Sequence, residues 1–579
     1  METSYEVLRR YIDKAEVILG GCALVLMISY WGFEFNHNVN VLILIMSEVI
    51  ALLFTAFTYG KVILGKKKLH HYLRKDILDL LLSSVILLFI FTENIFLAHR
   101  DEQFVRHIKT VYVQALQIYI FLKALIYLIL HREKWLYFSK KPVRVMVSSF
   151  LNLVIAGTLL LKLPNATTNG IEWIDALFIS TSAVCVTGLS TLNLATDFTT
   201  FGQVVIMILF QLGGLGILTL TSFAVLLLRR NMYLKDQFML QEALDQDNIN
   251  FIGKTLKNII ILTLMTEIIG ALTLYLIWEN SLSHDTPDVY FHALFHSISA
   301  FCNAGFSTFP QGLQAPELAN DIPSGFVICA LICIGGIGSY TISDLFTVEK
   351  NKLSMNRGLS FQSKWILKIS FILTFGGAFL IWLCQWSSWQ DLPWWQQLHY
   401  SMFSSVTCRT AGFSVVEMGD LLYPTLMIMI LLMYVGGAPN STAGGIKVTT
   451  LFVLVSYFFS KIKGRSQVHI DWHTISESSI QRALIVFVLS MITIFFTILT
   501  LTITDSQFAF EDLVFESISA LSTVGVSRGI TASFSPLGKL TLTIVMFFGR
   551  VGLFTFAFAL GGKSQDPVYQ YPITNISVG

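Results

Sequence analysis

The stretch that decides the fold is FISTSAVCVTGLS, Phe178 to Ser190, a short half-apolar segment that runs into a glycine-containing loop. Its first part follows the pattern F-x-S-x-[ST]-[AC], and this pattern occurs four times along the chain. The copies begin at Phe178, Phe295, Phe403 and Phe515. A pattern that recurs at a similar spacing indicates an internal repeat, which constrains the architecture of the whole chain.

Each copy ends in a glycine, 10, 10, 9 and 10 residues after its phenylalanine, in loops that read VTGL, NAGF, TAGF and TVGV. The glycines Gly188, Gly305, Gly412 and Gly525 are successively 117, 107 and 113 residues apart. That spacing accommodates a spanning helix, a half-helix that dips into the membrane, a loop and a second spanning helix. We therefore predict an all-α polytopic membrane protein with four helix, pore-loop, helix repeats around one pore.

The composition agrees with a chain that is embedded in a bilayer for most of its length. Hydrophobic residues make up 54% and charged residues 13%, and the mean hydropathy is +0.65, more apolar than a soluble core of this size needs. The formal net charge of +2 gives no reason to expect a nucleic-acid partner. The sequence contains neither HExxH nor GxxxxGK[ST], so we do not expect an enzyme, a covalent cofactor or a catalytic residue.

Four apolar segments precede the repeats, at about residues 15 to 35, 40 to 64, 76 to 98 and 110 to 130. We predict two domains: residues 1–135, an N-terminal four-helix membrane bundle that serves assembly or regulation, and residues 136–579, the cation-conducting pore. A voltage sensor would need a basic residue at every third position of its fourth helix. Here Arg106 and Lys109 are followed in that register by Tyr112, Ala115 and Ile118, which favours a bundle that does not sense voltage.

Basic clusters alternate with neutral or acidic loops along the chain, and short cytoplasmic loops are the ones enriched in Lys and Arg. This alternation predicts a multi-pass protein of the cell membrane with both termini in the cytoplasm. The loop around Arg100, Arg106 and Lys109 is an exception, because it falls on the outer side, where Asp101 and Glu102 partly offset its charge.

The residue types in the four loops suit a weakly hydrated monovalent cation. Glycine adopts positive φ without a Cβ clash, so a short loop can turn successive carbonyls toward one axis, where they replace the hydration shell of an ion. The C-terminal end of the short helix before the loop adds a partial negative charge. Asp and Glu are absent next to the glycines, which disfavours a calcium-type carboxylate ring. The alternative is that these small residues only allow close helix packing, as in many membrane bundles. Four copies of the motif in the same register disfavour this alternative.

Taken together, the motifs of the chain resemble the Trk/Ktr/HKT superfamily of potassium transporters, in the bacterial Trk/Ktr type. The resemblance covers roughly Pro142 to Gly579 and is carried by STSAVCVTGLSTL (Ser180 to Leu192), QLGGLG (Gln211 to Gly216), NAGFS (Asn303 to Ser307), RTAGFS (Arg409 to Ser414), GGAPNSTAGGIK (Gly436 to Lys447), STVGVS (Ser522 to Ser527) and GRVG (Gly549 to Gly552). It implies one pore per subunit, a homodimer, and a cytosolic ring of nucleotide-binding RCK subunits.

The resemblance also implies which residues form the filter. In this superfamily a glycine in all four loops accompanies potassium selectivity, whereas a serine in the first loop accompanies sodium transport. Potassium, the transported ion, would bind the filter formed by Val186, Thr187, Gly188, Asn303, Ala304, Gly305, Thr410, Ala411, Gly412, Thr523, Val524 and Gly525.

A gate is expected beneath the filter, where the span around Gly436 to Gly445 contains four glycines and Pro439 and should break as a helix. By resemblance the gate comprises Gly436, Gly437, Gly444, Gly445, Lys447 and Arg550. The alternative for the glycine-rich span is an ordinary helix kink. The alternative for Arg550 is a side chain that extends to the membrane surface or forms a purely structural ion pair. Glu267 and Glu516 are expected to hold pore helices by hydrogen bonds, and Arg409 to do similar work at the extracellular mouth.

The leading interpretation is therefore potassium uptake through a filter of backbone carbonyls, either passive or coupled to another ion. Two alternatives remain: a sodium-preferring transporter of the same family, which the four glycines disfavour, and a membrane sensor or scaffold that kept the fold but does not conduct.

Overall fold

The computed structural model describes residues 4–64, 84, 117, 120, 142–216, 252–281, 288–350, 359–553 and 555. These residues are helical apart from loops and one two-stranded hairpin. Among them, five helical segments are long and apolar enough to cross a membrane: Lys14–Gly32, Asn38–Gly60, Asn258–Ser281, Phe361–Gln385 and Glu477–Thr504. The predicted all-α polytopic fold is confirmed.

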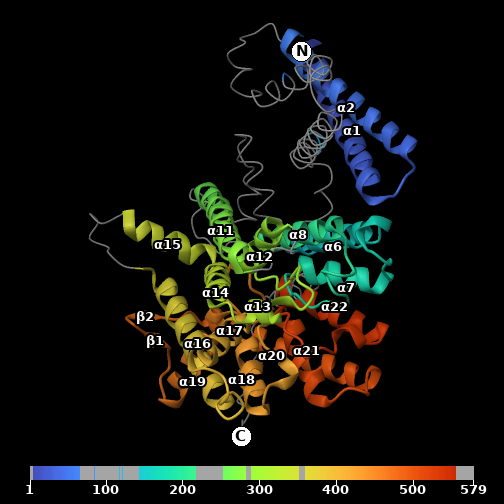
Figure 1. Cartoon of the computed structure of the whole chain (residues 1–579). Helices are drawn as coiled ribbons and strands as arrows, with labels where there is room; N and C mark the ends of the chain where they lie inside the picture. Colours follow the sequence, from blue (N-terminus) through green and yellow to red (C-terminus); the bar gives the residue numbers. More distant parts are fainter. Residues whose placement is uncertain are drawn as a thin grey trace.

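The first two predicted N-terminal spans correspond to α1 (Ser4–Gly32) and α2 (His37–Leu64). The two helices pack against each other (Figure 1) and share a small core that includes Ala23, Ile50 and Phe54. The predicted spans at 76–98 and 110–130 lie outside the described residues, apart from three isolated positions, as does the predicted domain boundary between residues 135 and 136.

From residue 142 onward the same three-part unit occurs four times, as predicted. Each unit opens with a longer helix: α6 (Pro142–Leu161), α11 (Ile252–Ser281), α16 (Phe361–Gln385) and α20 (Glu477–Thr504). A short pore helix follows: α7 (Trp173–Val184), α12 (Val289–Cys302), α17 (Trp394–Thr407) and α21 (Phe510–Leu521). After the loop, the chain returns through a second helix: α8 (Thr200–Leu215), α14 (Ile322–Ile337), α18 (Tyr423–Tyr434) and α22 (Pro536–Val551).

Local sequence explains where the second helices begin and end. A proline lies in the first turn of α14, α18 and α22, where its missing N–H costs nothing. Three of the four helices end at a glycine with positive φ: Gly216 at 76°, Gly338 at 86° and Gly552 at 90°. Residues with a Cβ rarely adopt this conformation, so these glycines terminate the helices.

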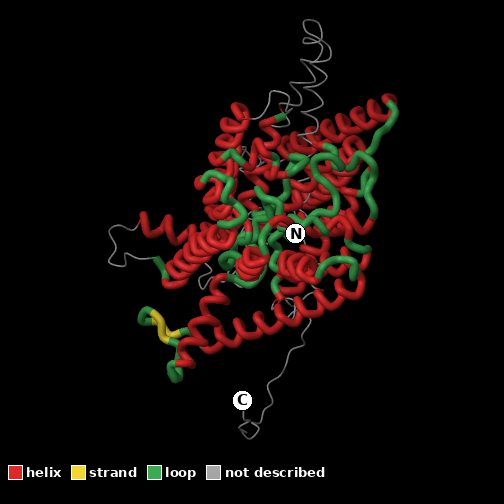
Figure 2. The backbone as a smooth tube through the Cα atoms, turned by 60° about the horizontal axis from the view of Figure 1, so that its bottom comes forward, coloured by secondary structure: helices red, strands yellow, loops and turns green. Residues whose placement is uncertain are grey.

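The remaining elements are short or lie at the edge of the molecule. They are α13 (Pro316–Ala319), α15 (Ser339–Lys350), α19 (Val448–Ile462), the strands β1 (His469–Ile470) and β2 (His473–Thr474), and the 3-10 turns η3 (Pro164–Ala166), η5 (Gly312–Gln314), η6 (Met418–Asp420) and η7 (Thr531–Ser533). Figure 2 shows the two strands at the periphery, whereas many of the loops gather in the middle of the molecule.

The four repeats follow one another in chain order around the middle of the molecule (Figure 1). Polar contacts link each repeat to the next: Asn193 Nδ2 donates to the Pro310 carbonyl at 2.7 Å, and Gln314 Nε2 to the Val416 carbonyl at 3.2 Å. Tyr423 donates to Glu511 at 3.3 Å. The ring is closed by an ion pair of 2.7 Å between Lys539 on α22 and Asp175 on α7.

Candidate functional site

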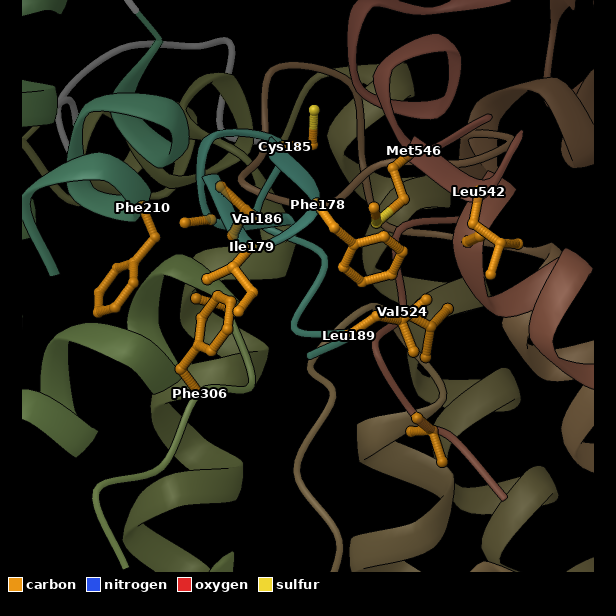
Figure 3. Close-up of a cluster of buried hydrophobic side chains, with 14 of the residues drawn as sticks. Phe178, Ile179, Cys185, Val186, Leu189, Phe210, Phe306, Val524, Leu542 and Met546 are labelled. Atoms are coloured by element: carbon orange, nitrogen blue, oxygen red, sulfur yellow. The ribbon is translucent and has the colours of Figure 1, made fainter. Parts of the chain in front are cut away.

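The phenylalanine of each motif copy anchors its pore helix in the protein core. Phe178, Phe295, Phe403 and Phe515 are all at most 1% exposed. Around the first loop, Figure 3 shows apolar side chains from repeats 1, 2 and 4 packed together, among them Phe178, Phe306 and Val524. The loops are therefore supported by a core that they share.

In the first three repeats, the serine two residues after the phenylalanine ties the pore helix to the long helix of the same repeat. The hydroxyls of Ser180, Ser297 and Ser405 donate to the backbone carbonyls of Val154, Glu267 and Thr374, respectively, each at 2.7 Å. Three residues after each acceptor stands a glycine whose Cβ would collide with the hydroxyl oxygen: Gly157, Gly270 and Gly377. The glycine is what lets the two helices approach.

Replacing Ser297 or Ser405 by alanine is expected to lower the free energy of unfolding by about 1 kcal/mol, since each change removes one buried hydrogen bond between two helices. The measurement is thermal or denaturant unfolding of the purified protein in detergent. Ser517→Ala is the matched control, because the Ser517 hydroxyl donates to Leu513 within its own helix. Equal losses for the three variants would contradict the interhelical role.

The four loops share one backbone conformation that turns their carbonyls. In each loop φ is positive at the glycine and at the residue two positions earlier: 57° and 95° at Val186 and Gly188, 60° and 69° at Asn303 and Gly305, 70° and 82° at Thr410 and Gly412, and 50° and 89° at Thr523 and Gly525. Successive carbonyls of an ordinary extended chain point to opposite sides, and reversing the sign of φ at every second residue turns them toward the same side. Positive φ at β-branched Val186, Thr410 and Thr523 costs about 1–3 kcal/mol each, which is characteristic of functional backbone.

The loops also meet one another, in cyclic order. A Cβ built on Gly188 would lie 2.5 Å from the Ala304 carbonyl oxygen, one on Gly305 would lie 2.7 Å from that of Ala411, and one on Gly412 2.8 Å from that of Val524. A Cβ on Gly525 would collide with the carbonyl oxygen of Thr187, which returns to the first loop. Eight of the twelve residues predicted to form the filter thus meet in these contacts, which run in a closed ring from loop to loop.

A hydroxyl four residues after each motif phenylalanine holds its loop. Ser299, Thr407 and Ser519 donate to the carbonyls of Phe306, Phe413 and Val526, which directly follow the glycines, at 2.9, 2.5 and 2.7 Å. In the first loop, Ser182 Oγ instead accepts from the Gly188 backbone N–H at 3.1 Å. The recurring hydroxyls in the motif were the sequence signal for this role, but their partners are visible only in the structure.

The predicted break in the third repeat is present. Helix α18 ends at Tyr434 and α19 begins at Val448, so the non-helical stretch is slightly longer than the glycine-rich segment. Its backbone binds α14: Ala438 N donates to the Gly336 carbonyl at 3.0 Å, and Thr442 N to that of Gly335 at 3.4 Å. At Gly444 a Cβ would collide with Thr523 Oγ1, and at Gly445 it would lie 3.1 Å from Ser522 Cα. The break therefore packs directly against the start of the fourth loop.

Arg550 and Lys447 attach to adjacent carbonyls of this broken stretch. Arg550 Nη1 donates to the Thr442 carbonyl, and Nη2 donates to the carbonyls of Gly213 and, at 3.3 Å, Gly214 near the end of α8. Lys447 Nζ donates to the Ala443 carbonyl at 2.5 Å. The guanidinium thus joins the first, third and fourth repeats beneath the loops.

The position of Arg550 is glycine in the other three repeats, a regularity missed when the sequence was read. QLGGLG, CIGGIG, YVGGAP and FFGRVG align, which places Arg550 at the position of Gly214, Gly336 and Gly437. The glycine before it packs against the pore-helix end, because a Cβ at Gly213, Gly335 or Gly549 would collide with the carbonyl oxygen of Val184, Phe301 or Leu521. The fourth repeat therefore has a positively charged side chain at a position where the other three repeats have no side chain.

The charged residues expected to hold pore helices do form hydrogen bonds, but one lies elsewhere than predicted. The Glu267 carboxylate on α11 accepts from the Gln211 amide at 2.9 and 3.1 Å, so it joins α11 to α8 rather than to a pore helix. Glu516, on the pore helix α21, accepts from Ser527, Arg528 and Thr531, which follow the glycine of the fourth loop. Arg409 donates to the Ser370 carbonyl at 3.0 Å and to Thr374 Oγ1 at 3.3 Å. Both partners lie within α16, because Arg409 follows the C-terminal end of its pore helix; the predicted position at the extracellular mouth is wrong.

The fourth loop contains the letters GVSRG, Gly525 to Gly529, which match the G-x-S-x-G of hydrolases. In those enzymes the serine sits on a sharp turn between a strand and a helix. Here Ser527 follows the pore helix α21 and donates to Glu516, with a carboxylate rather than a histidine as its partner. The match therefore has no catalytic context.

Four membrane hairpins whose turned backbones meet on one axis define a polytopic pore protein, a class in which unpaired backbone is tolerated because it lines a cavity. Residues 109–563 match the TrkH family model, described as "Cation transport protein". The chain belongs to this family of membrane transport proteins, which is not an enzyme family.

Two curated relatives and one solved structure are similar to the chain. "Ktr system potassium uptake protein B" of Bacillus subtilis (strain 168) is 35% identical over 458 residues, 77% of this chain and 98% of the relative. "Potassium/sodium uptake protein NtpJ" of Enterococcus hirae is 31% identical over 447 residues, 76% and 97% of the two chains. The structure of the potassium transporter TrkH from Vibrio parahaemolyticus matches with a TM-score of 0.61 and 16% identity, covering 89% of this chain and 98% of that one, which bears on the fold alone.

Proposed function

We propose that the protein takes up potassium across the cell membrane through a filter built from the backbone carbonyls of its four loops. The observation that carries the proposal is the shared conformation of the loops, which turns carbonyls toward the axis on which Gly188, Gly305, Gly412 and Gly525 meet. Carbonyl rings of this kind replace the hydration shell of a monovalent cation. The names of the relatives quoted above agree with potassium as the transported ion.

The gate of this pathway is the broken stretch below the filter. Gly436, Gly437, Gly444 and Gly445 let that stretch pack tightly beneath the loops. Arg550 holds the stretch there, and Lys447 fixes its internal fold by donating to the Ala443 carbonyl. Two cations in the path also oppose the passage of another cation. Opening requires the Arg550 contacts to break, so that the stretch can leave the axis.

Purified protein reconstituted in vesicles is expected to take up potassium, or rubidium as its tracer, in proportion to the amount of protein. Varying the potassium, sodium and proton gradients one at a time identifies any coupling ion. A second candidate is mixed or sodium-preferring transport, favoured by the name of the Enterococcus hirae relative, and it predicts sodium flux equal to or above that of rubidium. If the vesicles show no ion flux under any of these gradients, the result would contradict transport and favour a sensor or scaffold.

We also propose that the first 135 residues form a separate membrane domain for assembly or regulation, since α1 and most of the N-terminal segment precede residue 109, where the family match begins. Homodimer formation, a cytosolic RCK partner and cytoplasmic termini rest on the resemblance and on the charge pattern. Light scattering in detergent tests the dimer, co-purification with an RCK subunit tests the partner, and protease protection of a terminal tag tests the orientation.

A further inference from the structure

Beyond the glycines, every loop has a serine two residues after its filter glycine: Ser190, Ser307, Ser414 and Ser527. These four serines occupy equivalent positions at the end of the filter that leads away from the pore helix. Their hydroxyls, however, do not make equivalent hydrogen bonds, and the difference divides the four repeats into two pairs.

In the second and fourth repeats the serine is bound to its own pore helix. Ser307 Oγ lies 2.8 Å from His296 Nε2, and Ser527 Oγ donates to Glu516 Oε1. His296 and Glu516 occupy the same motif position, directly after the phenylalanine, and both are fully buried. His296 Nδ1 lies 2.8 Å from the His292 carbonyl, which can only accept, so Nδ1 carries a proton. In the neutral ring Nε2 then accepts from Ser307.

In the first and third repeats the serine is bound to its own loop instead. Ser190 Oγ donates to the Leu192 carbonyl at 2.6 Å, and Ser414 Oγ to the Val416 carbonyl. The residues that match His296 and Glu516 are Ile179, which has no acceptor, and Ser404, whose hydroxyl has no partner among the described residues. The first and third loops keep the bonds to Ser182 and Thr407 described above, but they lack this second connection to the pore helix.

The two connected loops face each other across the axis, because the glycine contacts run from repeat 1 to 2, 3, 4 and back to 1. Each connection is rigidly supported. The His296 ring stacks near Phe309 at 4.9 Å and meets Trp278 edge-on at 5.2 Å, while Glu516 also accepts from Arg528 N and Thr531 Oγ1, each at 3.2 Å. This second brace is thus present along one diagonal of the filter and absent along the other.

We propose that His296 and Glu516 are positioning residues for ion selectivity, which fix the width of the filter along the diagonal of repeats 2 and 4 through Ser307 and Ser527. The inference rests on the proposed potassium pathway. A filter with one braced diagonal keeps its carbonyls from closing around the smaller sodium ion, because contraction along that diagonal would break two buried hydrogen bonds.

The test compares the four serines, replaced by alanine one at a time, by the ratio of sodium to rubidium flux in vesicles. Ser307→Ala and Ser527→Ala are expected to raise the ratio about three- to tenfold, the equivalent of one buried hydrogen bond. The matched controls Ser190→Ala and Ser414→Ala should change it by less than about twofold. Equal effects of all four variants would overturn the proposal.

Variants of the pore helix test whether these residues act through the serines. Glu516→Leu should reproduce the effect of Ser527→Ala and add nothing to it in the double variant, whereas Glu516→Gln keeps an acceptor for Ser527 and should retain most of the selectivity. His296→Phe should behave likewise with Ser307→Ala. Additive effects in either double variant would overturn the route through the serines, and gel-filtration profiles identify any variant that fails to fold.

An ion-binding measurement on the wild-type protein in detergent distinguishes a failure of the proposed function from a failure of this inference. Thermal stabilisation by potassium over sodium, without any transport, supports the filter, and the serine variants are then compared by the same preference. Absence of any preference in the wild type would overturn both the function and this inference. A wild-type preference that no serine variant alters would overturn the inference alone.

Discussion

Replacing Gly188 by serine is expected to abolish most of the discrimination against sodium. The new Cβ would lie 2.5 Å from the Ala304 carbonyl oxygen, at a φ of 95° that residues with a side chain rarely adopt. Relief of the clash must move a carbonyl of the second loop or the backbone of the first. We expect the ratio of rubidium to sodium flux to fall by about tenfold or more, since losing one well-placed carbonyl contact costs at least about 1.4 kcal/mol.

The matched control is Gly170→Ser, in the same repeat. Gly170 also has positive φ, 79°, but a Cβ there would meet no atom within 4 Å. Both variants therefore carry backbone strain, while Gly188→Ser alone disturbs the filter. Flux ratios are measured in vesicles with both ions present on the same side. Unchanged selectivity in Gly188→Ser, or an equal change in Gly170→Ser, would count against the filter assignment.

Replacing Arg550 by glycine is expected to increase flux strongly. The change restores the residue found at this position in the other three repeats and removes the hydrogen bonds to the carbonyls of Thr442, Gly213 and Gly214. A hydrogen bond from a charged donor contributes about 1.5–3 kcal/mol, so losing two or three of them shifts a closed pathway toward opening by about tenfold or more. Initial rates of rubidium uptake measure the change.

Arg409→Met provides the control for removing a buried guanidinium. Arg409 binds Ser370 and Thr374 on α16, and among the described residues it makes no hydrogen bond with the broken stretch. Its loss should lower thermal stability without raising flux. Flux that stays constant in Arg550→Gly, or that rises equally in Arg409→Met, would refute the gate.

The repeats and the loops were predictable because their signals are local. Each motif phenylalanine lies within a pore helix, and each glycine adopts the positive φ that its lack of a Cβ permits. The break near Pro439 was predictable for the same reason, since proline and glycine act on their own backbone. Its observed extent, between Tyr434 and Val448, differs from the prediction by only a few residues.

Contacts between distant segments were not predictable from one sequence. Arg550 and its acceptor Gly213 are 337 residues apart in the chain, and no local pattern relates them. The wrong location of Arg409 has a similar cause: the sequence shows that Arg409 adjoins a loop, but only the path of the chain shows that it follows the deep end of the pore helix. The unequal bonds of the four equivalent serines depend on residues that the motif leaves unspecified, such as His296 and Glu516.

The ion pair between Lys539 and Asp175 bears on the order in which the four repeats can be connected along a chain. It joins the last repeat to the first without a peptide connection, at a junction where Gly525 and Thr187 also meet. In a ring of repeats that is closed in this way, any of the four repeats could come first in the sequence. A circularly permuted chain that begins with the second repeat would contain every side chain needed to close the same circle.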